Sequence, residues 1–459
     1  MGEEISKFSE GRRLNTWKEI ASYFGRDERT VKRWEASRSL PVRRMPKGPR
    51  SVVFAYERDL AVWRDGAASS EPADNDGSGT PGWKTETSHN APPPIPATGR
   101  KWWLIAGVGS AVAVVISVWA LSGFLVEHRQ NAGLPATNRE AASFYQTGVY
   151  EWQTRTPEGL LHAVDDFTQS IVHDPGFAPA YAGLAMCFNL LREYTTMAPE
   201  DAYPKAKAAA ERAISLDPSL ANAHAALAFV EFYWSRDSGA ANREFRRALA
   251  LAPRDPITHQ WFATMLMEIG DFDGATREIE KAESLDSEST AIRADKGLIL
   301  YFSGRKSEAI TLLERLEQAQ PAFASTHRYL AWMFLWRGDD TGYLNELEAT
   351  ANLRHDAAEA QVALAGRHGL IKGGHRGMLT AELAAQQRLW SRRQTSAYAL
   401  AITFAALGDT QGAFEFLRRS IKQREAEEIG LGIDPSFDAL RGQAEFRKLA
   451  ASASALQRS

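Results

Sequence analysis

The sequence predicts a mainly α-helical protein in three parts: a small head with a helix-turn-helix and a β-hairpin, a single apolar helix, and a solenoid of helical hairpins. Three observations predict this organisation. Two short amphipathic helices near the N-terminus are separated by a glycine turn, a stretch of 25 residues carries no charge, and a 34-residue register recurs in the second half of the chain. The 459 residues are enough for more than one domain.

The apolar stretch, residues 102–126, is predicted to be a transmembrane helix. It reads WWLIAGVGSAVAVVISVWALSGFLV, and its polar side chains are three serines, which can bond to the carbonyl one helical turn earlier. Such a helix would be roughly 37 Å long, and the hydrocarbon core of a bilayer is about 30 Å thick. Because a hundred residues precede it, we do not expect a cleavable signal peptide. The alternative is a buried helix of a soluble core.

Charge is distributed unevenly on the two sides of this stretch. Residues 1–101 hold 18 basic and 14 acidic side chains, whereas the rest of the chain holds 36 and 43. A basic head suits contact with nucleic acid, and an acidic body suits a solvated receptor. The single cysteine, Cys187, excludes an intrachain disulfide, so the C-terminal part is expected to be stable by packing alone.

The head, residues 1–66, is predicted to begin with two short helices. Thr16 and Glu19 form a capping box, Gly25 ends the first helix, and Asp27 is a favourable N-cap for the second. Two short helices joined by a tight turn form a helix-turn-helix. The second helix and the turn before it carry basic side chains at intervals of three and four residues: Arg26, Arg29 and Arg33.

A β-hairpin and a closing helix are predicted to follow. Residues 42–45 and 51–56 have the composition of short strands, the segment between them has turn chemistry, and residues 57–63 can form a last helix. The hairpin carries four basic side chains: Arg43, Arg44, Lys47 and Arg50.

This arrangement resembles the winged helix-turn-helix of MerR-type and excisionase-like DNA-binding domains. TWKEIASYFGRDERTVKRWE is similar to their helix-turn-helix, and LPVRR with VFAYERDLAVW is similar to their wing and closing helix. The resemblance implies DNA as a partner, with one helix in the major groove and arginine pairing with guanine. We expect base contacts from Arg29, Thr30 and Arg33, and backbone contacts from Arg26, Lys32, Arg43, Arg44, Lys47 and Arg50.

An alternative remains open for the basic helix. Such a face is often only solvated, and Lys32 can pair with Glu28 one turn away. A single small winged domain also makes few phosphate contacts, so useful affinity is expected to need two copies, that is a homodimer, on a symmetric site.

The linker and the flanks of the apolar stretch suggest a topology. Residues 67–101 are rich in Pro, Gly, Ser and acidic side chains and are predicted to be a disordered tether. Arg100 and Lys101 favour a cytoplasmic N-terminus in the inner membrane, which places the C-terminal part in the periplasm or outside the cell. Gly109, Ala113 and Ser117 form a stripe of small residues that would permit two such helices to pack closely.

Residues 138–455 carry a helical repeat. Gly270, Gly304 and Gly338 are 34 residues apart, with small residues and large apolar residues at matching positions between them. The pattern resembles the tetratricopeptide repeat and implies an α-solenoid of about eight helical hairpins. Similar segment ends recur at steps of 35, 34, 34 and 34 residues, at 216–218, 251–253, 285–287, 319–321 and 353–355.

The resemblance also implies a concave groove that binds a peptide or protein. With the register of the family, the groove positions in this chain are Tyr233, Gln260, Arg328 and Trp332. For the neighbouring aromatic residues we predict ordinary packing between helices; these residues are Phe232, Trp234, Trp261, Phe334 and Trp336.

The sequence gives no indication of an enzyme, a metal or a cofactor. HExxH, paired CxxC, GxxxxGK[ST] and GxSxG motifs do not occur. Several histidines are scattered and are predicted to be surface residues: His162, His173, His355, His368 and His375.

The sequence therefore suggests a membrane-anchored transcription regulator, similar in layout to ToxR-type regulators, that binds DNA in the cytoplasm and senses a peptide, protein or envelope signal outside. The alternative is a membrane-anchored scaffold for protein complex assembly whose head does not bind DNA.

Overall fold

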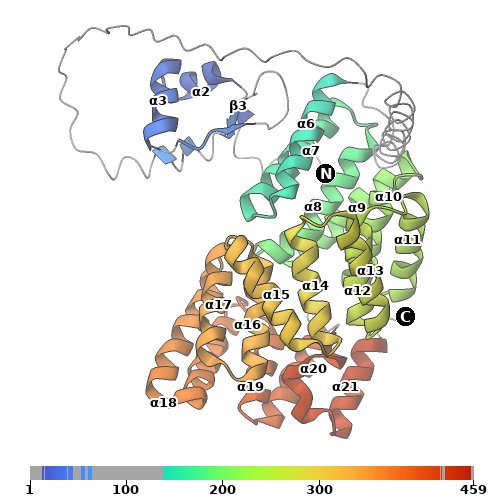
Figure 1. Ribbon diagram of the computed structural model, residues 1–459, viewed down its shortest axis with the longest axis vertical. Coiled ribbons are helices and arrows are strands. Elements are labelled where there is room, and N and C mark those ends of the chain that lie inside the picture. Colours follow the sequence, from blue (N-terminus) through green and yellow to red (C-terminus); the bar gives the residue numbers. More distant parts are fainter. Residues whose placement is uncertain are drawn as a thin grey trace, which may run out of the picture. The chain divides into compact units, whose positions relative to one another are not determined.

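The computed structural model describes residues 13–14, 16–38, 40–44, 53–56, 60–61, 63–64, 138–423, 425 and 430–455. They belong to two compact units, the N-terminal unit within Met1–Val115 and the repeat unit within Ile116–Ser459 (Figure 1). The predicted linker, residues 67–101, and the predicted span, residues 102–126, lie outside the described residues. Among the described helices, none is both long and apolar enough to cross a lipid bilayer.

Two helices of the N-terminal unit, α2 (Trp17–Tyr23) and α3 (Glu28–Arg38), follow the predicted capping signals. The Thr16 hydroxyl accepts a hydrogen bond from the Glu19 backbone N–H at 3.1 Å, and the Asp27 carboxylate accepts one from the Thr30 backbone N–H at 2.9 Å. Gly25 lies between the helices in the left-handed region, with φ of 61°, where a side chain would be strained.

Among the described residues of this unit, three short strands form a sheet with the order β1-β3-β2. β1 (Arg13–Leu14) and β2 (Arg43–Arg44) both pair antiparallel with β3 (Val53–Tyr56), so that Leu14 faces Ala55 and Arg44 faces Val53. The sequence did not indicate β1, because two residues are too few to show an alternating pattern.

A small apolar core holds the described part of the N-terminal unit together. Ile20, Val31 and Leu60 are fully buried in it. The Trp63 ring packs against Phe24 and Trp34 at centroid distances of 5.7 Å in both cases. The predicted closing helix therefore contributes Leu60 and Trp63 to the core, although its bounds lie outside the described residues.

The repeat unit is built from successive antiparallel helices, which Figure 1 shows from teal α6 to red α21. In the described part of the chain the helices form eight hairpins and a C-terminal cap. Their bounds are α6 Arg139–Gln153 with α7 Pro157–His173, α8 Ala178–Tyr194 with α9 Pro199–Leu216, α10 Ala221–Val230 and the π-helical η1 Glu231–Ser235 with α11 Ser238–Leu251, α12 Pro256–Glu268 with α13 Phe272–Leu285, α14 Thr290–Phe302 with α15 Lys306–Ala319, α16 Ala324–Arg337 with α17 Asp340–Leu353, the two halves of α18 Ala357–Trp390, α19 Ala397–Ala406 with α20 Thr410–Gln423, and finally η3 Pro435–Leu440 and α21 Ala444–Ala455.

The 34-residue register has a direct structural cause. Gly270, Gly304 and Gly338 each follow the first helix of a hairpin with φ of 82°, 86° and 78°, a backbone conformation that ends a helix and favours glycine. Buried Ala275 and Ala282 let the second helix approach closely, and large apolar side chains such as Leu313 fill the space between helices. The structure thus confirms the predicted solenoid of helical hairpins.

The hairpin formed by α18 departs from this pattern. Its two halves are separated by Gly373 and Gly374, and Gly374 has φ of 60° and ψ of −154°. A Cβ on Gly369 would lie only 2.2 Å from the Gly377 carbonyl oxygen, so the two backbones touch where the halves cross. Glycines at these positions replace the single turn glycine that follows α12, α14, α16 and α19.

In three hairpins, a histidine ties the first helix to the second. His224 Nδ1 lies 2.7 Å from a carboxylate oxygen of Glu244, and its Nε2 lies 3.0 Å from the Pro218 carbonyl oxygen. His259 makes the same two contacts with Glu278 and Pro253 at 2.6 and 3.0 Å, and His327 makes them with Glu346 and Pro321 at 2.7 and 2.8 Å.

Candidate ligand-binding cavity

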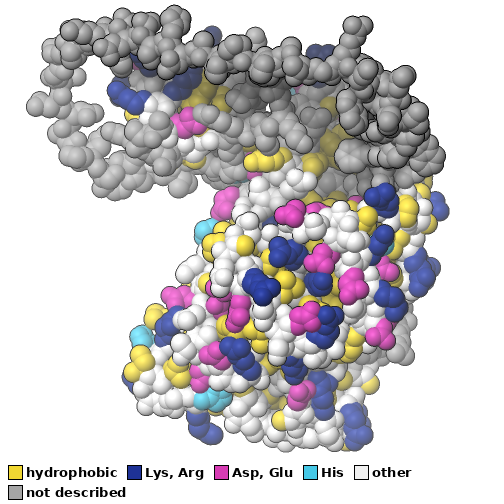
Figure 2. Space-filling model, in the orientation of Figure 1, with side chains coloured by type: hydrophobic (Ala, Val, Ile, Leu, Met, Phe, Trp, Pro, Cys, Tyr) yellow, Lys and Arg dark blue, Asp and Glu magenta, His cyan; other side chains and the backbone are white. Residues whose placement is uncertain are grey.

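The first helices of the hairpins face a cavity of about 1710 Å³ inside the repeat unit. Its wall comes from α8, α10 with η1, α12, α14 and α16, and is continued by α18 and α19. Gln423, Glu425 and part of residues 430–436 also reach the wall, so the described C-terminal part of the chain borders the cavity. Outside the cavity, the face of the repeat unit in Figure 2 carries acidic and basic side chains interspersed.

Aromatic side chains form much of the cavity wall. The Phe229 ring lies 4.4 Å from Tyr233 and 4.9 Å from Trp261, measured between ring centroids. Trp332 packs 5.6 Å from Tyr329 and keeps 39% of its surface exposed. Such rings provide large apolar contact area with little loss of side-chain entropy on binding.

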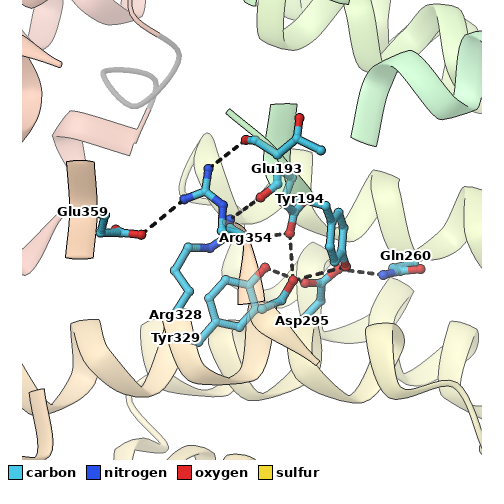
Figure 3. A network of polar contacts seen from close by, with 10 residues as sticks. Glu193, Tyr194, Gln260, Asp295, Arg328, Tyr329, Arg354 and Glu359 are labelled. Carbon is cyan, nitrogen blue, oxygen red and sulfur yellow. Dashed lines mark hydrogen bonds and ion pairs between the residues drawn. The ribbon is translucent and has the colours of Figure 1, made fainter. Parts of the chain in front are cut away.

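A polar network at the centre of the wall joins helices that are far apart in the sequence (Figure 3). The Arg328 guanidinium of α16 donates to the Glu193 carboxylate at the end of α8, which also accepts a hydrogen bond from the Ser325 hydroxyl at 2.9 Å. Arg354, just after α17, donates to the Thr195 carbonyl at 3.1 Å. These contacts fix the second hairpin against the sixth and close one side of the cavity.

This network stabilises the ionised form of Glu193. Burial raises the pKa of Glu193, but the Arg328 guanidinium and the Ser325 hydroxyl more than offset burial and leave that pKa below its usual value. The carboxylate is therefore ionised at neutral pH, and the pair acts as a charge-assisted clamp.

Asp295 of α14 is the second carboxylate in the network. It accepts hydrogen bonds from the Gln260 amide at 2.7 Å and from the Tyr329 hydroxyl at 2.8 Å. Burial, followed by the nearby charge of Glu193, raises the pKa of Asp295 to about 6. Neutral donors thus satisfy this carboxyl group, and no cation within hydrogen-bond distance pairs with it among the described residues.

Two more carboxyl groups of the wall have raised pKa values. Burial, followed by the charge of Asp434, raises the pKa of Glu268 to about 7. Burial also raises the pKa of Glu382 to about 8, against a hydrogen bond from Tyr343 that lowers it. The cavity therefore holds several carboxyl groups that a positively charged ligand would favour in their ionised form.

All four groove positions expected from the sequence line this cavity, and they differ in exposure and in hydrogen bonding. Trp332 is the most exposed of them, whereas Tyr233 is packed between Phe229 and Phe232. Gln260 and Arg328 are already bonded within the chain, as described above. Among the neighbouring aromatic residues, Phe232, Trp261 and Phe334 are buried, which is the predicted packing role, while Trp234 and Trp336 are partly buried and line the cavity.

Three residues important to the cavity escaped sequence reasoning. Glu193 and Glu382 lie in hairpins with weak repeat signals, so no register pointed to them. Asp295 could have been found, because it lies 35 residues after Gln260 and 34 before Tyr329, a step that places side chains of successive hairpins side by side.

The expected DNA-contacting residues whose side chains are described lie on α3 and the turn before it. Arg26, Arg29 and Arg33 have exposed side chains. The Thr30 hydroxyl donates to the Asp27 carboxylate at 3.0 Å, so its expected contact with a base competes with a helix cap. For Arg43 and Arg44 the structure describes the backbone of β2, and Lys47 and Arg50 lie outside the described residues.

Lys32 pairs with Glu28, as the alternative interpretation of the basic helix expected. Its ammonium lies 3.0 Å from the Glu28 carboxylate, one turn earlier in α3, and 5.4 Å from the centre of the Trp17 ring. Because both charged side chains are about half exposed, the pair is weak, and a phosphate could displace it.

One cluster in the described part of the chain places three potential metal ligands within 4.8 Å of one another: Glu317, His327 and Glu346. Both ring nitrogens of His327 are already used, by Glu346 and by the Pro321 carbonyl. Because two other hairpins repeat these bonds, we assign the cluster to the histidine ties.

The remaining histidines vary in environment. His162 is fully buried, with Nδ1 at 3.9 Å from the Glu151 carboxylate, so its prediction as a surface residue was wrong. It lies on the inner side of α7, which an irregular first hairpin did not reveal. His355 and His375 are exposed and contact Glu158 and Asp340 at 2.9 and 2.6 Å.

Comparison with known proteins gives similarity of fold. No known protein family matches the chain, and no curated protein is similar to it. Yeast Tom70 is similar at 16% identity with a TM-score of 0.38, over 75% of this chain and 78% of Tom70. PilF from Pseudomonas aeruginosa is similar at 17% identity with a TM-score of 0.32, over 61% of this chain and 98% of PilF. The human IFIT1 dimer with PPP-AAAA is similar at 16% identity with a TM-score of 0.41, over 71% of this chain and 92% of IFIT1.

Its own hairpin geometry and 34-residue register make the repeat unit a helical solenoid of the tetratricopeptide-repeat type. The chain as described is mainly α-helical.

Proposed function

We propose that the repeat unit is a non-enzymatic binding module, which holds a segment of a partner protein in its cavity and serves as a scaffold for assembling a protein complex. The observation that carries this proposal is the cavity of about 1710 Å³ with a partly exposed Trp332 in its aromatic wall. Its volume exceeds the roughly 300–1,000 Å³ of small-molecule pockets. Exposed aromatic anchors of this kind concentrate binding energy at protein interfaces.

The test is selection of a random peptide library, displayed on phage, against the full-length chain. We expect recovery of peptides whose binding weakens at least about tenfold on Trp332→Ala, a change of about 1.4 kcal/mol. Tyr150→Ala is the matched control, because Tyr150 has a similar exposed fraction of 37% but lies on α6 away from the cavity wall. Equal binding to wild type and Trp332→Ala would argue against the cavity as the binding site.

DNA binding by the N-terminal unit is a second proposed function. Exposed Arg29 and Arg33 on α3 and Arg26 in the turn before it, together with a strand pair in the expected position of a wing, support it. In this reading the chain is a transcription regulator held in the inner membrane by residues 102–126, with its N-terminus cytoplasmic, and the cavity senses a peptide or protein outside. Two copies would bind a symmetric site, as a homodimer.

Gel-shift binding of the full-length chain to genomic fragments, across a salt series, separates the two functions. A DNA-binding head gives a salt-sensitive shift that Arg29→Ala with Arg33→Ala abolishes. The control is Arg315→Ala, an exposed arginine of α15. Absence of a shift, or one that ignores both salt and the double substitution, supports the scaffold with a head that does not bind DNA. Activity of a reporter enzyme fused at Ser459 tests the membrane topology separately.

A further inference from the structure

One face of the second half of α18 lines the cavity. Leu379, Glu382, Gln386, Leu389 and Trp390 all contribute to the wall. The first four are three or four residues apart, and Trp390 lies four residues after Gln386, so they share one side of the helix. The face combines two polar side chains with apolar neighbours on either side.

Each of the two polar side chains has an acceptor oxygen that receives no hydrogen bond. Glu382 is 2% exposed, and its Oε1 has no hydrogen-bond partner, although Tyr343 is bonded to the carboxyl group. Gln386 is 7% exposed, and its amide Oε1 also lacks a partner. A buried acceptor without a donor costs about 1–3 kcal/mol. Both atoms are closed to solvent, and Glu382 Oε1 lies against Gly366, so a ligand donor reaches them when the two side chains turn towards the cavity that they line.

The surroundings of Glu382 favour a positive charge. The charged side chain that acts on its carboxyl group is Asp340, which has the same sign and helps burial to raise the pKa of Glu382. Arg354, an arginine of the cavity wall, is engaged elsewhere: it lies 3.5 Å from the Glu359 carboxylate and donates to the Thr195 carbonyl. No lysine is among the described residues that line the cavity.

The cavity as a whole is acidic. Nine carboxyl groups and five arginine side chains belong to its wall. Arg328 is paired with Glu193, so it does not offset the other carboxyl groups of the wall. Glu268 and Glu382, with pKa values of about 7 and 8, are partly protonated at neutral pH, so the negative charge is smaller than this count, but it still favours a basic ligand over an acidic one.

The chemistry of the face selects among cations. Two oxygen atoms are too few for Ca²⁺ or Mg²⁺, which take six or more oxygen ligands. An ammonium group has three donors, and a guanidinium group has five. The leucines beside Glu382 would contact the methylene stem of a lysine or arginine side chain, which is apolar.

We propose that the α18 face is a specificity subsite, which recognises a lysine or arginine side chain of the bound protein segment. This inference rests on the proposed binding of a protein segment in the cavity and names the chemistry of that segment. On binding, Glu382 and Gln386 would turn towards the cavity, the ligand cation would donate to their Oε1 atoms, and its stem would lie against Leu379 and Leu389.

The test compares peptides that a random phage-displayed library yields on four full-length targets: wild type, Glu382→Gln, Gln386→Lys and the control Glu280→Gln, an exposed carboxylate of α13. Wild type and Glu280→Gln are expected to enrich lysine and arginine severalfold over the unselected library. Glu382→Gln is expected to lose this enrichment while still binding peptides. Gln386→Lys places an ammonium group next to Glu382, so this variant is also expected to lose the enrichment of lysine and arginine.

Thermal unfolding shows whether the variants fold. Gln386→Lys is expected to raise Tm, because its ammonium pairs with Glu382, whereas Gln318→Lys on the exposed side of α15 is expected to leave Tm unchanged. Peptides without enriched lysine or arginine, or enrichment that survives in both cavity variants, would overturn the subsite and leave the cavity as a binding site. Recovery of no peptides from wild type would overturn the proposed function with it.

Discussion

The hairpins with histidine ties and the α18 hairpin differ in how a carboxyl group between their helices is paired. In the former, an imidazole lies between a carboxylate and a backbone carbonyl, at 2.6–3.0 Å from each in the case of His259. Because both neighbours are acceptors, both ring nitrogens carry a proton, and the imidazolium neutralises Glu278. In the α18 hairpin, Glu382 has Tyr343 as a neutral partner and an acceptor left over.

The difference distinguishes groups that hold the fold from groups available to a ligand. Ionisable groups between the helices of regular hairpins are paired inside the chain, so their removal should destabilise it. The unpaired group at the cavity wall should cost stability while the cavity is empty. Substitutions at the two kinds of site should therefore change stability in opposite directions.

The largest loss is expected for Arg328→Met, in the network that closes the cavity. Without the guanidinium, the partly buried Glu193 carboxylate loses its hydrogen-bonded cation and keeps only the more distant charge of Arg155, which costs up to about 3–5 kcal/mol of unfolding free energy. Denaturant unfolding of the full-length chain measures it. Adding Glu193→Gln should recover much of the loss, because the uncompensated charge is then removed. A loss below about 1 kcal/mol, the worth of an exposed pair, would contradict the clamp.

His259→Gln should destabilise the chain by about 1.5–3 kcal/mol at low pH, the range for hydrogen bonds to charged groups. Burial lowers the pKa of His259, but its bonds to Glu278 and the Pro253 carbonyl more than offset burial, and the pKa is raised. The stabilisation is thus complete below the unfolded pKa of about 6.5 and fades as pH rises through the folded value.

Thermal unfolding of wild type and His259→Gln between about pH 5 and pH 9 follows this dependence. His368→Gln, an exposed histidine of α18, is the control and should change little at any pH. A difference between wild type and His259→Gln that grows as pH rises would refute the imidazolium assignment.

Gly304→Ala should cost about 1–2 kcal/mol, because residue 304 has φ of 86° and a Cβ is strained there. No heavy atom lies within 4 Å of the added Cβ, so the cost is conformational. Gly373→Ala, with φ of −148° and the same open surroundings, should cost clearly less. Equal losses in chemical denaturation would show that the turn glycine has another role.

Glu382→Gln should stabilise the chain, in contrast to the first three changes. The pKa of Glu382 is about 8 in the folded state, above the ordinary value of 4.5, so wild type loses stability as pH rises between these values. The variant has no such loss, and its Tm should exceed that of wild type by about 2–4 °C near pH 8. Glu280→Gln should not show this difference. A lower Tm for Glu382→Gln at pH 8 would place Glu382 among the groups that hold the fold.

The sequence predicts the features that repeat and misses those that do not. Gly270, Gly304 and Gly338 revealed the hairpin turns because a positive φ recurs at a fixed step. The clamp between Glu193 and Arg328 joins residues 135 apart, and such a pair leaves no periodic signal. The sequence could therefore predict the solenoid and which helices face inward, but not what closes the cavity.

In the N-terminal unit, too, the sequence predicted some features and not others. The caps at Thr16 and Asp27 could be read because they depend on residues three positions away. The pairing of β1 with β3 depends on residues more than forty positions apart, and the use of the Thr30 hydroxyl by Asp27 depends on side-chain geometry.

The most direct test of the account is the affinity of a fluorescein-labelled, lysine-containing peptide from the phage selection, measured by fluorescence anisotropy on full-length wild type and Trp332→Ala. Binding through the aromatic cavity predicts a Kd at least about tenfold higher for Trp332→Ala and an unchanged Kd for Tyr150→Ala. The same Kd for all three proteins would contradict the claim that the cavity of the repeat unit is where this protein binds its partner.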